Sequence, residues 1–144
     1  ITFNYGLILG WTSIENSINF LPIILYIGAI FWTLGYDTIY GYQDINDDEI
    51  IGVKSTSIKF KKNPKRFLSL CYSITILSYL CIGIIMDFNF YFYVGLIILI
   101  AHLFLYQIKG FILNDIQKCL KIFKSNNFFG LLVLIFICLG KLNI

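Results

Sequence analysis

The residues most able to do chemistry lie between positions 36 and 60, in the stretch YDTIYGYQDINDDEIIGVKSTSIKF. Five of the eight acidic residues fall there, in a chain of 144 residues that is 58% hydrophobic. The five are Asp37, Asp44, Asp47, Asp48 and Glu49. Clustered carboxylates suit a hard divalent cation, and Mg²⁺ is usually held by one or two of them together with waters and substrate phosphates.

Helix geometry predicts which carboxylates act together. A helix that continues past residue 36 would place Asp37, Asp44 and Asp48 within roughly 40° of one another on one face. Like charges at this spacing repel, so the arrangement favours a bound counter-ion such as Mg²⁺. We therefore predict that these three aspartates are metal ligands. Asp47 lies about 80° from them on a helix and is a candidate for a second ion or for contact with water.

Lys54 follows the last of these aspartates by six residues and would meet phosphate charge beside the metal. The alternative is an ordinary solvated loop, because any membrane protein keeps its charged residues in loops. The density of Asp rather than Glu and the uncharged flanks of the segment favour a metal site. Glu49 is expected to face water.

The rest of the chain predicts membrane helices. Charged residues make up only 13% of the chain and the mean hydropathy is +0.81. Its uncharged runs approach the roughly 20 residues that a spanning helix needs. We expect an all-α, polytopic transmembrane bundle of about five helices, near residues 1–14, 20–36, 67–86, 88–108 and 126–142, with polar loops at 37–66 and 109–125.

The eleven Lys and Arg residues are unevenly distributed along the sequence. Six lie between Asp37 and Arg66, and four between Lys109 and Asn127. Two predicted spans separate these segments, so both should emerge on the same, cytoplasm-like face of the membrane. Orientation and anionic headgroups explain the net charge of +3, and no basic helix with interleaved aromatic residues stands outside the spans, so we expect no nucleic-acid partner.

Three polar residues stand near or inside apolar runs. His102 is the one histidine and falls within a predicted span, where it is either a functional residue or a neutral imidazole bonded to a neighbouring helix. Asn126 and Asn127 are expected to cap the final helix, with contact to a substrate pocket as the alternative.

The segment around the aspartates resembles a known family. It is similar to the second aspartate-rich motif of the UbiA-type intramembrane prenyltransferases, which runs YDTxYAxxDxxDDxxxGxKSTAxxFG. The residues that match in register are Tyr36, Asp37, Thr38, Tyr40, Asp44, Asp47, Asp48, Gly52, Lys54, Ser55, Thr56 and Phe60. The departures are Gly41 and Ser57 where the motif has Ala, and Lys61 where it has Gly.

The resemblance also includes CLKIFKSNNFFG, which ends at Gly130, and the region from Asn4 to Trp11, so it covers essentially the whole chain. It implies that residues 1–144 form the C-terminal part of one nine-helix transmembrane domain. The implied activity is transfer of a polyprenyl group from polyprenyl diphosphate to the ring of 4-hydroxybenzoate, ortho to the hydroxyl, in ubiquinone biosynthesis. The implied membrane is a bacterial cytoplasmic membrane or a mitochondrial inner membrane.

The resemblance also implies roles for individual residues. Asp44 and Asp48 would ligate Mg²⁺ on the diphosphate and Asp37 would assist them, which makes these three aspartates the expected catalytic residues. Lys54 would bind a phosphate oxygen. We assign Tyr40 to the diphosphate site as well. With Tyr36 and Tyr42, this tyrosine would otherwise stabilise a carbocation by cation–π contact or belong to an interfacial aromatic belt.

Members of this family carry an earlier motif, NDxxDxxxD, that these residues lack. The remaining acids are Glu15, Asp87 and Asp115, of which the first two fall on the opposite face of the predicted topology. We therefore expect half of the metal site to lie in N-terminal helices and this chain alone to be inactive. The competing hypothesis is a fragment of a membrane transporter or channel with a cation-binding acidic loop, which should place ionisable residues near mid-span.

Overall fold

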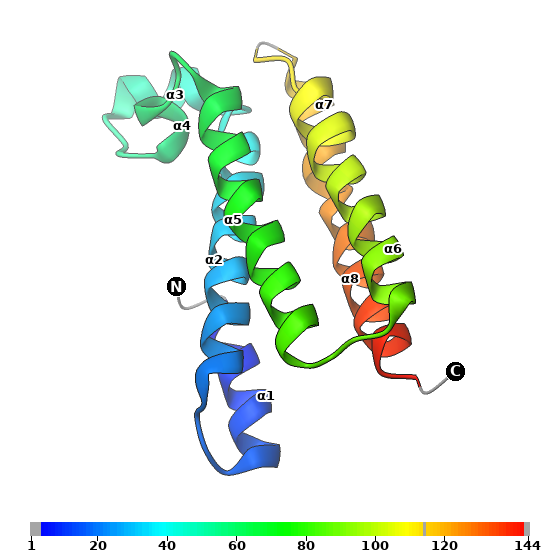
Figure 1. The fold of residues 1–144 in the computed structure, drawn as a ribbon. Helices are drawn as coiled ribbons and strands as arrows, with labels where there is room; N and C mark the ends of the chain where they lie inside the picture. Colours follow the sequence, from blue (N-terminus) through cyan, green and yellow to red (C-terminus); the bar gives the residue numbers. More distant parts are fainter. Residues whose placement is uncertain (1–3, 114, 143–144) are drawn as a thin grey trace.

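The computed structural model describes residues 4–113 and 115–142, and these are helices joined by short connections (Figure 1). No β-strand occurs in the described ranges, so the predicted all-α fold class is confirmed. Among these residues, four helical segments are long and apolar enough to cross a membrane, which agrees with an integral membrane protein. They are Phe20–Gly41, Pro64–Ile85, Phe90–Ile108 and Ile116–Lys141.

Two helices precede the acidic segment and two short ones lie within it. Helix α1 (Tyr5–Glu15) is shorter than a span, and α2 (Phe20–Gly41) runs five residues beyond its expected end at 36. The segment expected as a loop at 37–66 therefore begins as helix. It then contains α3 (Ile45–Ile51) and α4 (Thr56–Lys59) before α5 (Pro64–Ile85) starts.

The second half of the chain forms a helical hairpin. Helix α6 (Phe90–Ile100) continues without interruption into a π-helix, η2 (Ala101–Ile108). Helix α7 (Ile116–Lys124) occupies much of the second expected loop, and only Ser125 separates it from α8 (Asn126–Lys141). The last two helices together form the 26-residue segment counted as the fourth span.

Short polar side chains mark where the helices begin. Asn19 accepts a hydrogen bond from the backbone N–H of Leu21 at 3.0 Å, which satisfies one of the free donors at the start of α2. Asn89 does the same for α6, and Asp115 for α7. Pro64 stands in the first turn of α5, where its missing N–H costs no helical hydrogen bond.

The spans form two pairs that lie side by side (Figure 1). Helix α2 packs against α5, and α6 packs against α8, while α7 contacts α2 and so joins the pairs. Helices α3 and α4 lie at the same end of the bundle as the connection that precedes α7. The α1–α2 connection and the turn between α5 and α6 lie at the other end, so the two lysine-rich segments share one end.

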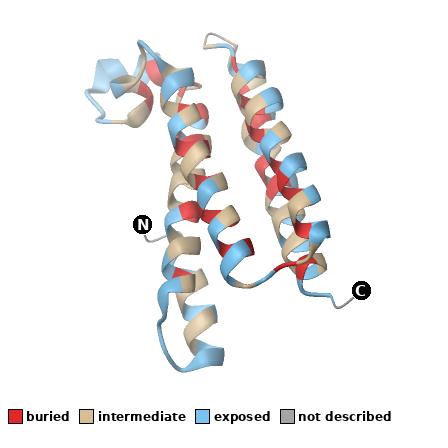
Figure 2. Cartoon of the chain, in the orientation of Figure 1, coloured by how far each residue is buried: buried red, intermediate tan, exposed pale blue. Residues whose placement is uncertain are grey.

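Buried residues line the facing sides of the helices, and exposed residues cover the outer sides (Figure 2). Many of the outer residues are large and apolar. Examples are Leu70, Leu77, Ile97, Leu105 and Leu131. In water such a surface would be unfavourable, but it suits contact with a bilayer or with other spans, since lipid tails are as apolar as leucine.

A chain of polar side chains crosses the interior between the spans. Gln107 of η2, which is fully buried, accepts a hydrogen bond from the Tyr72 hydroxyl of α5. Its amide nitrogen lies 3.0 Å from Oδ1 of Asn126 on α8, and the same oxygen accepts from the Trp32 indole of α2 at 2.9 Å. His102 Nδ1 lies 3.3 Å from the Gln107 amide nitrogen. All four spans are therefore bonded to one buried network.

The α2–α5 pair depends on a close approach between small residues. A Cβ atom built at Gly28 of α2 would lie only 2.7 Å from Cβ of Ser78 on α5. Beside it, the Thr75 hydroxyl donates to the Gly28 carbonyl at 3.2 Å. Without a hydrophobic driving force between helices in lipid, such small-residue packing and interhelical hydrogen bonds hold spans together.

Replacement of Gly28 by Val should therefore weaken the packing of α2 on α5, by roughly 1–3 kcal/mol as expected for overpacking a tight contact. Unfolding in mixed micelles, followed by far-ultraviolet circular dichroism, would measure the loss. Gly10→Ala is the matched control, because a Cβ there meets nothing within 4 Å. Equal stability of Gly28→Val and the unaltered protein would show that the close approach is not a stabilising contact.

Candidate functional site

The site begins on the last turn of α2, which presents Asp37 and Tyr40 at the end of the bundle that carries α3 and α4. The Asp37 carboxylate is exposed, and the Tyr40 side chain is 43% exposed. The Tyr40 ring packs on Phe123 of α7 with centroids 4.7 Å apart. The helix thus holds a carboxylate and a phenol one turn apart, and α7 fixes the phenol from the side.

The helix does not continue as far as Asp44. It ends at Gly41, and Tyr42 and Gln43 form a turn before α3 begins at Ile45. The condition for aligning Asp37, Asp44 and Asp48 on one helical face is therefore not met. The reason is tertiary packing, because Tyr42 turns inward and is buried against Phe111, which redirects the chain.

Asp44 and Asp48 remain together on the new helix. Asp44 occupies the position before the first turn of α3, and its carbonyl accepts from the Asp48 N–H at 2.9 Å. One helical turn separates the two residues, which places them on the same side. Asp44 is exposed and Asp48 is half-buried, while Asp47, also in the first turn, is exposed. Asp44 and Asp48 thus lie at the start of α3, whereas Asp37 lies on α2.

The position of the acids at the start of α3 reduces their mutual repulsion. Asp47 and Asp48 lie in the first turn, where the free N–H groups carry partial positive charge. A negative side chain in that turn contributes about 0.3–1 kcal/mol to a helix. Helix α3 ends at Gly52, whose φ of 79° is accessible to a residue without a side chain.

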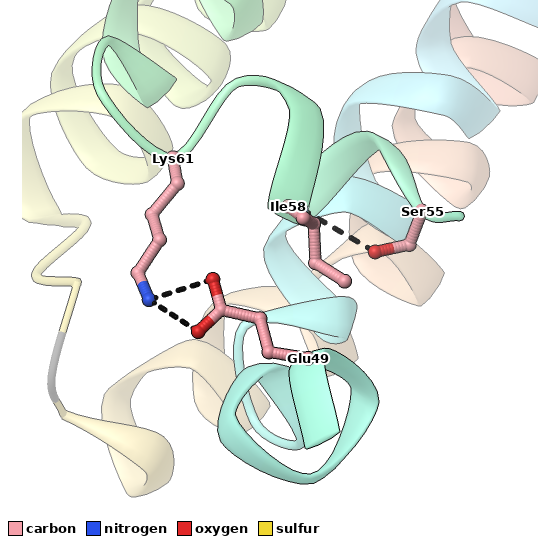
Figure 3. A network of polar contacts seen from close by, with 4 residues as sticks. All are labelled: Glu49, Ser55, Ile58 and Lys61. Carbon is pink, nitrogen blue, oxygen red and sulfur yellow. Dashed lines mark hydrogen bonds and ion pairs between the residues drawn. The ribbon is translucent and has the colours of Figure 1, made fainter. Parts of the chain in front are cut away.

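Glu49 is the acid of this segment that is already paired (Figure 3). Its carboxylate oxygens lie 2.8 and 2.9 Å from Nζ of Lys61, which ties α3 to the segment after α4. This is the single ion pair found among residues 4–113 and 115–142, so the four aspartates of the segment have no cationic partner within that part. Their charge is available to a cation from outside.

Lys54 lies between α3 and α4, exposed and on the rim of an open pocket of about 470 Å³. Ser55 and Lys59 also line this pocket. Ser55 caps α4 by accepting from the Ile58 N–H at 3.3 Å (Figure 3). Thr56 lines the pocket as well, so the polar lining is two lysines and two hydroxyl residues, a set of donors suited to phosphate oxygens.

Burial of Tyr42 raises the pKa of its phenol to about 12, because burial disfavours the phenolate. The side chain is 2% exposed, and its hydroxyl has no hydrogen-bond partner among the described residues. This tyrosine therefore stays protonated at neutral pH and serves as the apolar anchor of the turn before Asp44.

No group of three or more His, Cys, Asp and Glu side chains in the described ranges comes close enough to hold a metal ion. The pair of Asp44 and Asp48 fits the open kind of site in which one or two carboxylates share Mg²⁺ with water and phosphate. The residues present fit part of such a site and do not close it.

Two of the three departures from the aspartate motif, Gly41 and Ser57, lie against each other. A Cβ atom at Gly41, at the end of α2, would overlap the hydroxyl of Ser57 on α4. Ser57 is buried, and nearby the hydroxyls of Thr38 and Thr56 are hydrogen bonded at 2.7 Å. The Ser57 hydroxyl, which the Ala of the motif lacks, thus occupies the space that the methyl of Ala would fill at position 41. This contact packs α4 against α2.

Comparison with known proteins assigns the family. Residues 1–135 match the sequence profile described as the UbiA prenyltransferase family. That range includes the whole acidic segment. The chain belongs to the UbiA prenyltransferase family. Membership favours a prenyltransferase over the transporter or channel considered from the sequence.

Individual relatives of this UbiA family member carry more specific names. The chain is 38% identical over 144 residues to a protein of Bos taurus named 4-hydroxybenzoate polyprenyltransferase, mitochondrial, covering 99% of this chain and 38% of that one. A Dictyostelium discoideum protein of the same name is 36% identical over 143 residues, covering 99% and 31%. A Francisella tularensis protein named 4-hydroxybenzoate octaprenyltransferase is 34% identical over 139 residues, covering 94% and 47%.

The chain thus spans between about a third and a half of the length of these relatives. No solved structure matches it.

The sequence reasoning missed the role of Asn126, which does not cap α8 but accepts hydrogen bonds from Trp32 and Gln107 in the interior. It also left open whether His102 is functional, and the structure places this histidine beside the same network. The available signal was the occurrence of Gln and Asn next to apolar runs, since amides buried in lipid must find partners in other helices.

Gly41→Ala should destabilise this UbiA family member, by roughly 1–3 kcal/mol, because the new methyl group overlaps the Ser57 hydroxyl. Ser57→Ala alone should have a smaller effect. The double variant should recover most of the loss, giving a coupling free energy of roughly 1 kcal/mol or more in a double-mutant cycle. Urea or mixed-micelle unfolding measures all three. Strictly additive effects would contradict the proposed exchange of volume between the two positions.

Proposed function

We propose that this chain contributes to a membrane-embedded enzyme that transfers a polyprenyl group from polyprenyl diphosphate to the ring of 4-hydroxybenzoate, in ubiquinone biosynthesis. The observation that carries the proposal is the motif from Tyr36 to Phe60, matched in register, in a chain whose relatives bear that activity in their names. Because the chain spans less than half of those relatives, the activity is proposed for the native polypeptide that carries these residues.

The chemistry sets clear requirements. The C1–O bond of the polyprenyl diphosphate breaks, a ring carbon of the acceptor bonds to C1, and the ring carbon loses its proton. The leaving diphosphate carries about three negative charges, so positive charge must be placed against it as they develop. When bound, Mg²⁺ would offset part of this charge as a Lewis acid.

We assign Asp44 and Asp48 to hold Mg²⁺, with Asp37 as an assisting carboxylate and Asp47 as a candidate for a second ion. The support is that these carboxylates lack a cationic partner in the described part of the chain, whereas Glu49 is paired with Lys61. We assign Lys54 to bind a phosphate oxygen, supported by its place on the rim of the pocket lined by residues 53–59.

Tyr40 is the second residue assigned to the diphosphate end of the substrate. Its exposed side chain stands one turn beyond Asp37 on α2, and its ring is fixed by Phe123. The apolar spans below would accept the isoprenoid tail and keep water from the cationic carbon. A bilayer is the natural source of so long a tail, which favours a site open to lipid.

The orientation we propose follows the lysines. Segments 37–66 and 109–125 carry ten of the eleven basic residues and lie at one end of the bundle. Following the positive-inside rule, we propose that the aspartates lie on the cytoplasmic side of a bacterial inner membrane or the matrix side of a mitochondrial one.

Asp44→Asn in the native polypeptide should lower Mg²⁺-dependent prenyl transfer by at least a hundredfold, since a neutral amide replaces a ligand carboxylate of the same size. Transfer of labelled prenyl diphosphate to 4-hydroxybenzoate, measured in isolated membranes, gives the rate. The amount of protein in the membrane fraction should not change.

Glu49→Gln is the matched control, because this acid lies in the same short helix but is paired with Lys61. It should keep most of the activity. Full activity of Asp44→Asn, or equal losses in both variants, would support the ordinary solvated loop in place of a metal site.

A further inference from the structure

A pocket of about 360 Å³ lies between α2 and the junction of α7 with α8, next to the acidic segment. Small-molecule sites usually occupy roughly 300–1,000 Å³, so this one suits a small ligand. Its lining residues are Trp32, Tyr36, Phe123, Asn126, Asn127 and Gly130. None of them is charged.

Aromatic rings form the walls of this pocket and are held in place by one another. The Trp32 and Tyr36 rings meet edge to face with centroids 5.4 Å apart, and Tyr36 lies 5.7 Å from Phe123. The Trp32 indole is also fixed by its hydrogen bond to Asn126. Such rigid faces favour a planar aromatic ligand, which gains stacking or edge-to-face contact with them.

The two amides at the pocket, Asn126 and Asn127, differ in how many of their hydrogen-bonding groups are already used. The Asn126 oxygen accepts two hydrogen bonds, and its nitrogen donates to the carbonyls of Ile122 and Phe123 at 3.3 and 3.1 Å. Asn127 is exposed, and its side chain forms no hydrogen bond within the described part of the chain. It is therefore the polar group that a ligand can use.

The π-helix explains why Asn126 is held so firmly. His102 and Gln107 are five residues apart, and in an α-helix they would point about 140° away from each other. The i to i+5 bonding of η2 stacks them instead, so that the imidazole meets the amide that binds Asn126. The network thus holds the Trp32 ring in place at the pocket. The residue after Asn126, Asn127, keeps its amide free of hydrogen bonds to the described residues.

We propose that this pocket binds the ring of a hydroxylated aromatic acceptor, with the Asn127 amide hydrogen bonded to the phenolic hydroxyl. An amide both donates and accepts, as a hydroxyl does. The neutral lining offers no ion pair, so a carboxylate on the same ring faces the open mouth of the pocket and a diphosphate is excluded.

This inference rests on the proposed function and specifies its acceptor site. Tyr36 belongs to the wall, and the next residue of α2 is Asp37. A ring held here therefore lies alongside the segment assigned to the diphosphate, as the joining of two substrates requires.

Binding can be measured without any transfer reaction. Of the two tryptophans in these 144 residues, Trp32 lines the pocket. In the native polypeptide, the fluorescence that is lost in a Trp32→Phe variant is therefore the signal from the pocket. We expect 4-hydroxybenzoate to quench it saturably in detergent micelles, and benzoate to do so with about two- to tenfold weaker affinity, the value of one neutral hydrogen bond. Geranyl diphosphate should not compete.

Asn127→Ala should lower the affinity for 4-hydroxybenzoate by the same two- to tenfold. The affinity for benzoate should not change, since benzoate lacks the hydroxyl. Gln117→Ala is the matched control, as another exposed amide of this hairpin that does not line the pocket. Gly130→Ala is a second variant. Its methyl group would lie 3.3 Å from the Trp32 ring. By narrowing the pocket, it should lower the affinity for both 4-hydroxybenzoate and benzoate.

Absence of saturable quenching, competition by geranyl diphosphate, or an equal effect of Asn127→Ala on both ligands would overturn the proposal. The outcome is separate from that of the proposed function. If 4-hydroxybenzoate binds as expected but no transfer depends on Asp44, the pocket stands and the proposed function fails. If transfer depends on Asp44 while Asn127→Ala changes neither quenching nor the KM for the acceptor, the function stands and the pocket fails.

Discussion

The fold depends on satisfying two buried amides inside an apolar bundle. Gln107 and Asn126 lie where water cannot solvate them, and in lipid an unpaired polar group costs several kcal/mol. Their partners come from the other two spans, Tyr72 on α5 and Trp32 on α2. Small-residue packing in membranes gives helices close contact without a strong preference for register, whereas hydrogen bonds between named side chains specify one arrangement.

The same buried hydrogen bonds also position the candidate site. Because the Trp32 indole donates to Asn126, α2 is held against the start of α8, and the turns of α2 beyond it carry Tyr36, Asp37 and Tyr40 toward α7. The end of α2 then meets α4 through the volume shared by residues 41 and 57. The acidic segment is thus positioned by a buried network below it and by a tight contact beside it.

The sequence predicted the parts of the fold that depend on local composition. Uncharged runs long enough to cross a bilayer identified the spans. The uneven distribution of the lysines indicated which connections share one end of the bundle. Both signals follow from the cost of charge in lipid. The break after Gly41 depends on the burial of Tyr42 against Phe111, a contact 69 residues away in sequence that no local pattern contains. Helix α7 was not predicted for a related reason. Its lysines indicated a loop, whereas its other face, which carries Cys119 and Ile122, is buried.

The same break decides what the aspartates can do. A continuous helix would hold three like-charged carboxylates rigidly on one face. The turn instead leaves Asp44 before, and Asp48 within, a seven-residue helix that is too short to persist alone. Burial of Ile45 and the Glu49–Lys61 pair hold that helix to the rest of the protein, and an exposed ion pair contributes no more than about 1 kcal/mol. The contacts that position the two aspartates are therefore weak, and a cation bound between these carboxylates would be energetically coupled to the placement of α3.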